Sequence, residues 1–413
     1  MNKFVYNDYS YEIKRDNLKI FFHFSIEPNI NFYPEITIRK VNKKRLLSIG
    51  KNFIDNLIFN LGLAEIPTYW KATCSPEIVI RAGYLDSYQI KWWQNLILKG
   101  MGQFFYENKI SFLMPGFKIE SSIKNHAYRG PLDRQKTLVA VGGGKDSVVT
   151  LETLKKKGKQ INCFSLNPTP AAKKIIRIAG CKQPIIVERK IDKKLLELNR
   201  KGYLNGHTPF SAYLAFLSVL LGAIFDYKYL AFSNEKSADE GNLKYLGKTI
   251  NHQWSKGSEF EKLFGQYSKK YLVKNIEYFS FLRHLYEIQI AKLFSKHPKY
   301  FYAFMSCNEA FKTGSGTKKP IKKWCGKCPK CLFVFACLYP FLKEKELIKI
   351  FGKNLFDDKK LIPVMEKLIG QRGFKPFECV GTIKESLTAF YLSLKRAKKE
   401  KKTLPFLLAH LNY

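Results

Sequence analysis

The stretch "LVAVGGGKDSVVTLETLKKKG", residues 138–158, places three consecutive glycines between an apolar run and a helical pattern. The run 137–141 predicts a buried strand, and the apolar residues that follow Ser147 recur at helical spacing. In α/β proteins, a strand that turns through glycines into a helix offers the bare N–H groups of the helix N-terminus to an anion. The stretch therefore predicts a phosphate site at the end of a parallel strand.

The same alternation of strand and helix continues along the chain. Continuous apolar runs are typical of parallel strands buried on both faces, and they predict further strands at 161–166, 184–189, 227–232 and 300–306. Helices are predicted at 147–157, 170–180, 209–225 and 277–295. This order predicts an α/β fold with a doubly wound parallel sheet.

Changes in pattern predict three parts of the chain. Residues 1–125 mix short alternating runs with a helical run, which indicates an N-terminal α+β domain and a candidate substrate-binding unit. Residues 126–340 hold the doubly wound sheet and a cysteine cluster, and residues 341–413 read as a helical C-terminal extension.

Composition sets broad limits on function. The 413 residues are 46% hydrophobic and carry a formal net charge of +37, but their lysines are scattered over almost every segment. The charge is therefore as compatible with a solvated lysine surface as with a nucleic-acid partner. The unbroken apolar run 209–225 is shorter than the ~20 residues that a bilayer core needs, so a buried helix is expected rather than a membrane span. The N-terminus lacks a signal-peptide pattern, and an odd count of nine cysteines predicts reduced or metal-bound thiols in the cytoplasm rather than disulfides.

The glycine loop has its own chemistry. It matches neither the Walker loop, because Asp146 follows the lysine, nor the Rossmann fingerprint, because position 147 is Ser. Glycine backbone can approach a phosphate closely, Lys145 adds a positive charge, and Asp146 is a candidate ligand of Mg²⁺. The candidate nucleotide-binding residues are Gly142, Gly143, Gly144, Lys145, Asp146 and Ser147.

The segment "WCGKCPKC" places Cys325, Cys328 and Cys331 at intervals of three residues. Such a turn directs several thiolates at one centre, and Zn²⁺ takes four ligands tetrahedrally. Cys307, at the end of the last predicted strand, is the expected fourth ligand. The alternatives are core cysteines without metal and a redox pair. Cys74, Cys163, Cys181 and Cys379 are isolated in the sequence and show no metal spacing.

Polar residues gather directly after the predicted strand 227–232. The segment 233–261 contains Glu235, His252 and Glu259, and His207 precedes the buried helix 209–225. Because strand ends of this kind bind ligands, these residues are candidates for a substrate or magnesium site. The alternatives are an ordinary polar loop and, for His207, a helix cap.

Two resemblances follow from these motifs. The glycine loop resembles that of the N-type ATP pyrophosphatases (PP-loop enzymes), usually Ser-Gly-Gly-x-Asp-Ser, from which it departs at Gly142. In that class the loop grips the pyrophosphate that leaves when ATP adenylates a substrate. Between about residues 60 and 335, the stretches "YWKATCSPEIVIRAGYLD", "NGHTPFSA", "SNEKSADEGN", "NHQWSKGSEFE" and "WCGKCPKC" together resemble the MurL-type epimerases, which act on UDP-N-acetylmuramoyl-L-alanyl-L-glutamate in peptidoglycan synthesis.

The resemblance implies an activity. In that family ATP and Mg²⁺ convert the terminal L-glutamate of the UDP-linked dipeptide to D-glutamate, through an acyl-adenylate, with release of AMP and pyrophosphate. The epimerisation needs groups that remove and return the α-proton. The candidates, each near a predicted sheet edge, are His207, His252, Glu235 and Glu259.

Rival interpretations share the loop. A 7-cyano-7-deazaguanine synthase-like enzyme also joins a PP-loop to a four-cysteine knuckle, but it leaves residues 1–125 and the C-terminal extension unexplained. A tRNA-modifying thiolase or lysidine-type enzyme is favoured by the net charge, and only under such a reading is nucleic acid a partner. A thiolase needs a metal-free redox pair, whereas this cluster is spaced for metal. A nucleotide-binding module without catalysis predicts a degenerate loop, yet Asp146 and Ser147 are intact.

Overall fold

The computed structural model describes residues 3–124, 126–132, 136–311, 323–400 and 403–411. Within these ranges one mixed sheet contains eleven strands. They are β1 (Lys3–Lys14), β2 (Asn17–Ile26), β3 (Ile30–Phe32), β4 (Glu35–Ile38), β5 (Glu77–Ile80), β6 (Gly116–Ile119), β7 (Lys136–Ala140), β8 (Gln160–Leu166), β9 (Ile185–Lys190), β10 (Tyr229–Phe232) and β13 (Glu277–Ser280). Their order is β13-β10-β7-β8-β9-β4-β2-β1-β5-β6, with β3 paired to β2.

Helices surround this sheet. The longer ones in the first 300 residues are α2 (Lys51–Trp70), α3 (Ser87–Gly100), α5 (Lys145–Lys156), α6 (Pro170–Ile178), α7 (Lys193–Arg200), α8 (Phe210–Phe225), α9 (Ser258–Tyr267) and α10 (Glu287–Phe294). The shorter ones there are α1 (Lys43–Ile49) and α4 (Gly102–Glu107), and a hairpin pairs β11 (Leu243–Tyr245) with β12 (Lys248–Ile250). The C-terminal part holds α11 (Asn308–Phe311), α12 (Pro329–Leu338), α13 (Glu344–Phe351), α14 (Ile362–Leu368), α15 (Ile383–Glu400) and α16 (Phe406–Ala409).

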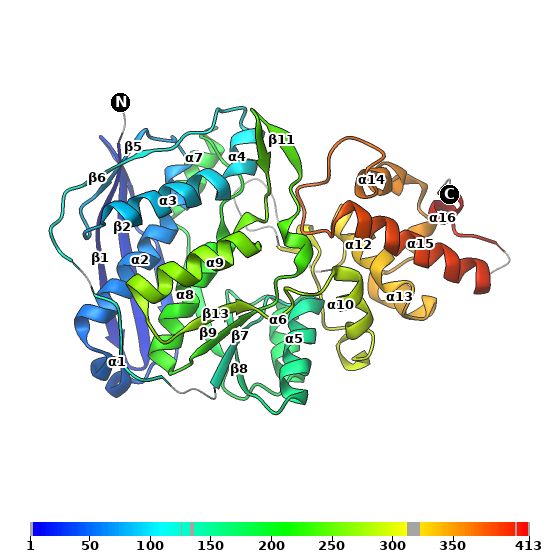
Figure 1. Cartoon of the computed structure of the whole chain (residues 1–413), viewed down its shortest axis with the longest axis horizontal. Helices are drawn as coiled ribbons and strands as arrows, with labels where there is room; N and C mark the ends of the chain where they lie inside the picture. The colour runs from blue at the N-terminus through cyan, green and yellow to red at the C-terminus, as the bar shows by residue number, and fades with distance from the viewer. Residues whose placement is uncertain (1–2, 125, 133–135, 312–322, 401–402, 412–413) are drawn as a thin grey trace.

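The five strands from β7 to β10 and β13 form the doubly wound half of the sheet. All pairings among these five strands are parallel. Alternate side chains enter opposite cores: Leu138 packs with α2 and α8, whereas its neighbour Val139 packs with α5, α6 and α10. Figure 1 shows helices on both faces of these strands. The predicted α/β class and the strands at 137–141, 161–166, 184–189 and 227–232 are confirmed.

The predicted strand at 300–306 is wrong. Residues 298–303 form a 3₁₀ turn and further turns, and the edge strand is instead β13, within the segment predicted as the helix 277–295. Helix α10 begins only at Glu287. The apolar run 300–306 is buried by helix packing rather than by strand pairing, since Phe301 contacts Phe294 with ring centroids 5.6 Å apart. An apolar run alone does not distinguish these two modes of burial.

The sheet continues into the N-terminal part of the chain. Strand β4 pairs with β9 in antiparallel register, with Glu35 opposite Lys190 and Ile38 opposite Val187. One sheet therefore crosses the division that the sequence analysis places near residue 126. Helix α2 packs on both halves, because it contacts α8 as well as β1 and β2.

Helix α8 is the apolar run 209–225, and it is buried as predicted, with residues such as Leu217, Leu220 and Leu221 fully covered. In the described part of the chain, no helix is both long and apolar enough to cross a bilayer. After α12 the chain is helical, as expected, and packs tightly: Phe356 and Phe390 have ring centroids 5.7 Å apart.

One expectation about the cysteines is wrong. Cys163 in β8 and Cys181, which follows α6, are joined in a disulfide with Cα atoms 6.1 Å apart. Helix α6 packs back over β8, so residues 18 positions apart in sequence become neighbours. None of the seven other cysteines takes part in a disulfide within the described residues.

Candidate active site

The glycine loop (residues 142–147) lies where the order of the sheet reverses. From β7 the chain proceeds through β8 to β9 on one side, and it then returns to β10 and β13 on the other side. Open α/β sheets bind ligands beyond the carboxyl ends of their strands at such a reversal. The fold therefore places this loop at the position where a ligand is expected.

The loop conformation suits an anion. Gly143 has φ +104°, and a Cβ there would lie 2.9 Å from the backbone nitrogen of Ala172. Gly142 borders open space, since a Cβ there would meet nothing within 4 Å. Gly144 is the N-cap of α5 and no side chain caps this helix; the Ser147 hydroxyl donates back to the Gly144 carbonyl at 2.9 Å. The first amides of α5 thus keep their positive end available for a negatively charged group.

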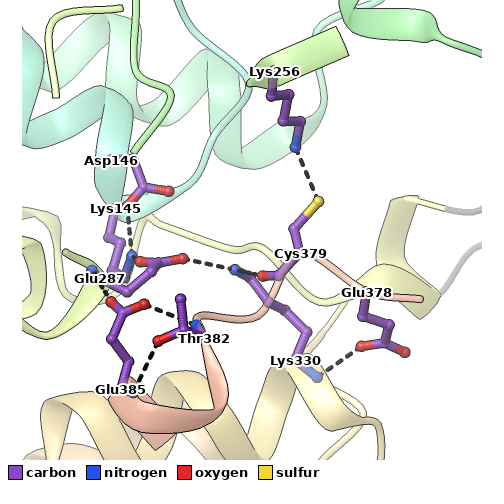
Figure 2. A network of polar contacts seen from close by, with 9 residues as sticks. All are labelled: Lys145, Asp146, Lys256, Glu287, Lys330, Glu378, Cys379, Thr382 and Glu385. Carbon is purple, nitrogen blue, oxygen red and sulfur yellow. Dashed lines mark hydrogen bonds and ion pairs between the residues drawn. The ribbon is translucent and has the colours of Figure 1, made fainter. Parts of the chain in front are cut away.

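The loop lysine points inward. Lys145 is 1% exposed, and its ammonium contacts the carboxylates of Asp146 and Glu287 (Figure 2). Glu287, the first residue of α10, also pairs with the ammonium of Lys330 at 3.3 Å. The sequence assigns Lys145 to a phosphate contact, whereas in the structure this side chain ties the loop to α10.

The electrostatics of this network favour ionised groups at its centre. Burial alone would raise the pKa of Glu287, but Lys145 and Lys330 outweigh it and hold that pKa below its usual range. Burial raises the pKa of Asp146, although Lys145 opposes the change. The balance leaves the pKa of Asp146 raised in spite of its contact with Lys145, and a cation placed beside this carboxylate would stabilise its negative charge.

Glu235 lies close to the loop. It follows β10 by three residues, at the strand end next to β7, and its side chain is 6% exposed. Burial, reinforced by the negative charges of Glu287 and Asp146, raises the pKa of Glu235 to about 7. A carboxyl group with this pKa exists in both protonation states near neutral pH, which is what a general acid or base requires.

The structure brings His207 and His252 together, with ring centroids 6.2 Å apart. Burial lowers the pKa of each to about 3, with His252 adding to the effect at His207 and Lys256 adding to it at His252. Both imidazoles are therefore neutral at pH 7.

Hydrogen bonds define the tautomer of His252. The amide nitrogen of Asn242 donates to the carbonyls of Lys375 and Pro376 at 3.2 and 2.9 Å, so its oxygen faces the histidine. That oxygen accepts from Nδ1 of His252 at 2.9 Å, which leaves Nε2 as a bare acceptor. Among the described residues this buried nitrogen has no hydrogen-bond partner.

Glu259 lies apart from these groups. Its side chain is 51% exposed, and its two oxygens accept from the Lys99 ammonium and, at 2.8 Å, from the Trp254 indole. Of the four predicted proton carriers, Glu259 is thus held at the surface, whereas the other three are partly or fully buried.

A second cluster stands opposite the loop in Figure 2. The ammonium of Lys256 donates to Sγ of Cys379 at 2.9 Å. The carbonyl of Cys379 accepts from the ammonium of Lys330, and the Glu378 carboxylate accepts from the Lys330 backbone N–H at 2.7 Å. Cys379, which the sequence presents as an isolated cysteine, thus belongs to the polar network of the loop.

The four predicted metal ligands converge. The Sγ atoms of Cys307, Cys325, Cys328 and Cys331 all lie within 4.8 Å of one another, with Cys325 and Cys328 at 3.6 and 3.5 Å from Cys331. Tetrahedral Zn²⁺ with Zn–S bonds of ~2.3 Å sets its sulfurs about 3.8 Å apart. The Lys327 and Cys328 amides also donate to the Cys325 sulfur, at 3.4 and 3.3 Å. The donor set therefore fits zinc.

The cysteine cluster is joined to the glycine loop. The amide of Met305, two residues before Cys307, donates to the carbonyl of Gly143 at 2.8 Å. Lys330, which lies between two of the cysteines in sequence, reaches Glu287 in the loop network. The cluster is therefore connected to the loop region at these two points.

Comparison with known families places the chain. Residues 1–281 match the family model described as the MurL N-terminal domain, and residues 303–411 match the MurL C-terminal domain. The chain belongs to the MurL family. Its division between the two models falls just after β13, whereas the sequence analysis divides the chain near residues 126 and 341.

Curated relatives agree with this membership of the MurL family. A protein of Xanthomonas oryzae pv. oryzae named UDP-N-acetyl-alpha-D-muramoyl-L-alanyl-L-glutamate epimerase is 35% identical over 80% of this chain and 73% of its own length. A protein of the same name from Salinispora tropica is 34% identical over 79% of this chain and 70% of its own. A solved structure, titled as a predicted subunit of tRNA methyltransferase from Methanocaldococcus jannaschii, is 18% identical over 39% of this chain, with a TM-score of 0.23.

Four residues of this MurL site escaped the sequence analysis: Lys256, Glu287, Lys330 and Cys379. One of them, Lys330, carried a usable signal, because it lies inside the cysteine motif. Glu287 begins a helix just after a strand, but the sequence analysis predicts a single helix over 277–295 and so gives this residue no special place. The contact of Lys256 with Cys379 spans 123 residues, and no spacing rule in a single sequence reports it.

Proposed function

We propose that this MurL chain is an ATP-dependent epimerase that converts the terminal L-glutamate of UDP-N-acetylmuramoyl-L-alanyl-L-glutamate to D-glutamate. The observation that carries the proposal is the uncapped N-terminus of α5 at the sheet reversal, in a chain whose relatives are named for this epimerase. AMP and pyrophosphate are the proposed products of ATP. A cytoplasmic location is part of the proposal, because ATP is the co-substrate.

The chemistry explains why an epimerase needs ATP. A free carboxylate opposes loss of its own α-proton, because the resulting carbanion would stand beside a negative charge. Adenylation of that carboxylate removes the charge and makes the carbonyl an acceptor for the electron pair. A base then removes the α-proton, an acid returns one to the opposite face, and hydrolysis releases the inverted acid.

The glycine loop is the proposed site for the β- and γ-phosphates. The backbone of Gly142, Gly143 and Gly144 and the amides that begin α5 supply the donors, and Ser147 adds a hydroxyl. Mg²⁺ would neutralise phosphate charge, and Asp146 is its proposed ligand because it is a carboxylate of the loop whose burial raises its pKa, an effect that a bound cation would oppose. Lys145 holds the loop in place through Glu287 rather than exposing its own charge.

We infer that the four-cysteine cluster holds structural zinc. All four positions are filled by sulfur, and a catalytic zinc site keeps one position for water or substrate. The metal would fix Cys307 and hence the Met305 amide against the Gly143 carbonyl. Its role is therefore to hold the loop rather than to take part in the reaction.

Among the sequence-predicted proton carriers, Glu235 is the strongest acid–base candidate. Its pKa of about 7 and its place beside the loop suit proton transfer to an activated carboxyl group. The neutral imidazoles of His252 and His207 lie in the same region, and the bare Nε2 of His252 is available to accept from substrate. Glu259, held at the surface, is a weak candidate.

The test uses the full chain with MgATP and the L,L-dipeptide nucleotide. The expected result is AMP and pyrophosphate together with D-glutamate, identified by chiral analysis of the hydrolysed product. Release of ADP and orthophosphate would contradict adenylation. AMP formation with tRNA or a deazaguanine carboxylate, and none with the dipeptide nucleotide, would replace the epimerase with one of its rivals.

A further inference from the structure

The C-terminal part of the chain returns one cysteine to the glycine loop. Residues 375–382 pass over α12 before α15 begins, and Lys330 of α12 contacts both the carbonyl of Cys379 and the carboxylate of Glu287. Glu287 in turn holds Lys145 of the loop. Figure 2 shows this continuous path from Cys379 to Lys145. The thiol is therefore fixed relative to the loop.

The thiol of Cys379 is set apart from the other cysteines of the described chain. It is free, it lies outside the four-sulfur cluster, and its side chain is partly accessible. The ammonium of Lys256 lies 2.9 Å from its sulfur. A sulfur in contact with an ammonium group is stabilised as the thiolate, which is the reactive form of cysteine.

Two positive charges dominate the surroundings of Cys379. Burial and the negative charge of Glu287 would raise the pKa of its thiol, but Lys256 and Lys330 outweigh both and lower it. Elsewhere the effect is opposite: burial raises the pKa of Cys74 to about 12 and raises that of Cys337 well above its usual value. Cys379 is thus a thiol whose surroundings favour negative charge.

A second observation points to a ligand in the same place. The bare Nε2 of His252 belongs to a side chain that is 6% exposed, and its ring lies 6.1 Å from that of Phe377, two residues before Cys379. Lys256 is close enough to influence His252, Cys379 and Glu235 electrostatically. The Lys256 ammonium therefore contacts the thiol directly and lies within electrostatic reach of the unsatisfied imidazole and of the Glu235 carboxyl group.

We propose that Cys379 is a catalytic residue of the epimerisation: its sulfur removes the α-proton of the activated glutamate, and Glu235 returns a proton to the opposite face. The inference rests on the proposed function, because only the activated carboxyl group makes this proton acidic enough. Lys256 is the positioning residue that keeps the sulfur ionised and directed at the site.

The step balances without any further reactant. The Cα–H bond breaks, an S–H bond forms, and the electron pair moves into the adenylate carbonyl to give an enolate. The enolate carbon then takes the proton of the Glu235 carboxylic acid, and the carbonyl re-forms. Cys379 is left as a thiol and Glu235 as a carboxylate, and exchange of one proton with water at each group restores the starting state.

The test separates adenylation from proton transfer. Wild-type chain, Cys379→Ala, Cys379→Ser and the control Cys74→Ala are incubated with MgATP and UDP-N-acetylmuramoyl-L-alanyl-L-glutamate in D₂O. AMP release reports adenylation, and deuterium at the glutamate Cα, measured by mass spectrometry, reports proton transfer. The serine variant keeps an oxygen for the Lys256 contact, so it guards against loss of folding in the alanine variant.

Both Cys379 variants are expected to release AMP at nearly the wild-type rate while deuterium incorporation falls roughly 10²- to 10⁴-fold, the usual contribution of one acid–base group. Cys74→Ala should match the wild type in both measurements. In Glu235→Gln, deuterium should enter Cα without inversion, because the sulfur still exchanges its own face.

Two results would overturn the proposal. Wild-type deuterium incorporation in both Cys379 variants would remove the sulfur from the reaction. Loss of AMP release in step with deuterium in both would show that Cys379 supports the loop instead. If the wild-type chain itself neither releases AMP nor inverts glutamate, the proposed function fails, and this outcome is recognisable before any variant is compared.

Discussion

Substitution of Gly143 by alanine tests the nucleotide loop at its most constrained position. The residue has φ +104°, and its new Cβ would lie 2.9 Å from the Ala172 nitrogen and 3.1 Å from the Ala171 Cβ. These atoms begin α6, whose first turn is held by the Thr169 hydroxyl at 3.1 Å from the Ala172 amide. The start of α6 is therefore held in place, and the contact has to be relieved by a shift of the loop backbone.

The energies of the two responses indicate whether the loop keeps its conformation or shifts. Keeping the native geometry would cost ~1–2 kcal/mol for the left-handed backbone and ~1–3 kcal/mol for the forced contact. Shifting the loop breaks the 2.8 Å bond from the Met305 amide to the Gly143 carbonyl, which is worth only ~0.5–1.5 kcal/mol. We therefore expect the loop to shift, with the free energy of unfolding lowered by about 1–2 kcal/mol. Loss of two amide contacts to charged phosphate, at ~1.5–3 kcal/mol each, should lower kcat/KM for ATP by roughly 10²- to 10⁴-fold.

Gly142 supplies the matched comparison one residue away. A Cβ at this position meets nothing within 4 Å, so Gly142→Ala should leave both stability and kcat/KM for ATP close to wild type. Gly142→Ser places a hydroxyl where PP-loop enzymes usually carry one, and a bond to phosphate worth ~1.5 kcal/mol would lower KM for ATP by roughly tenfold.

Two measurements on the three variants check this reasoning. Urea unfolding, followed by circular dichroism, gives the change in stability, and AMP formation against ATP concentration gives kcat/KM. Gly143→Ala with wild-type kinetics would show that the loop does not hold the nucleotide. Equal damage from Gly142→Ala and Gly143→Ala would show that the described loop conformation is wrong.

The remaining predictions concern the groups that support the loop. Glu287→Gln removes the carboxylate that pairs with the buried ammonium groups of Lys145 and Lys330. The free energy of unfolding, measured by urea titration, should therefore fall by ~3–5 kcal/mol, and a loss below about 1 kcal/mol would contradict the ion-pair network. Chelation of zinc, or Cys331→Ser, should raise KM for ATP and expose the loop to proteolysis. Atomic absorption follows the metal content. An unchanged KM in metal-free protein would show that the cysteine cluster does not support the loop. Folding raises the pKa of Glu235 from 4.5 to about 7, so its protonated form stabilises the protein below pH 4.5 and this contribution disappears as the pH rises through 7. The wild type should therefore lose roughly 3 kcal/mol of unfolding free energy between these pH values, and Glu235→Gln should not show this loss. Parallel curves of stability against pH for the variant and the wild type would refute the prediction.

The sequence specified the doubly wound half of the fold well, because buried parallel strands leave continuous apolar runs between helices. The sequence-based prediction was wrong at β13, which it assigned to a helix, and at residues 300–306, which it assigned to a strand. Aromatic side chains are buried in both segments. Hydrophobicity reports burial, and only the hydrogen-bonding partner distinguishes an edge strand from a turn that packs on a helix. The continuation of the sheet through β4 and β9 depends on the same kind of pairing, which joins residues about 150 positions apart.

The candidate site was likewise predictable where local motifs define it and not where distant residues meet. Local motifs identified the glycine loop and placed four cysteines that the fold does bring together. They did not rank the acid–base candidates, because His207, Glu235 and Glu259 differ in burial and charge rather than in sequence spacing. The disulfide between Cys163 and Cys181 was missed for a similar reason, since its partners meet only when α6 packs over β8.

In the proposed mechanism, the C-terminal extension supplies a group that the glycine loop lacks. A glycine loop with its helix N-terminus can activate a carboxylate, but it holds no group suited to remove a proton from carbon. Residues 375–385 bring Cys379 to Lys256, and they bring Glu385 to the backbone amide of Glu287 at 2.6 Å. The extension thus contacts the loop network at several points and adds a thiol with a lowered pKa. In the proposed mechanism the loop activates the carboxylate and the extension supplies proton transfer, so Cys379→Ala should lose epimerisation while it still forms AMP.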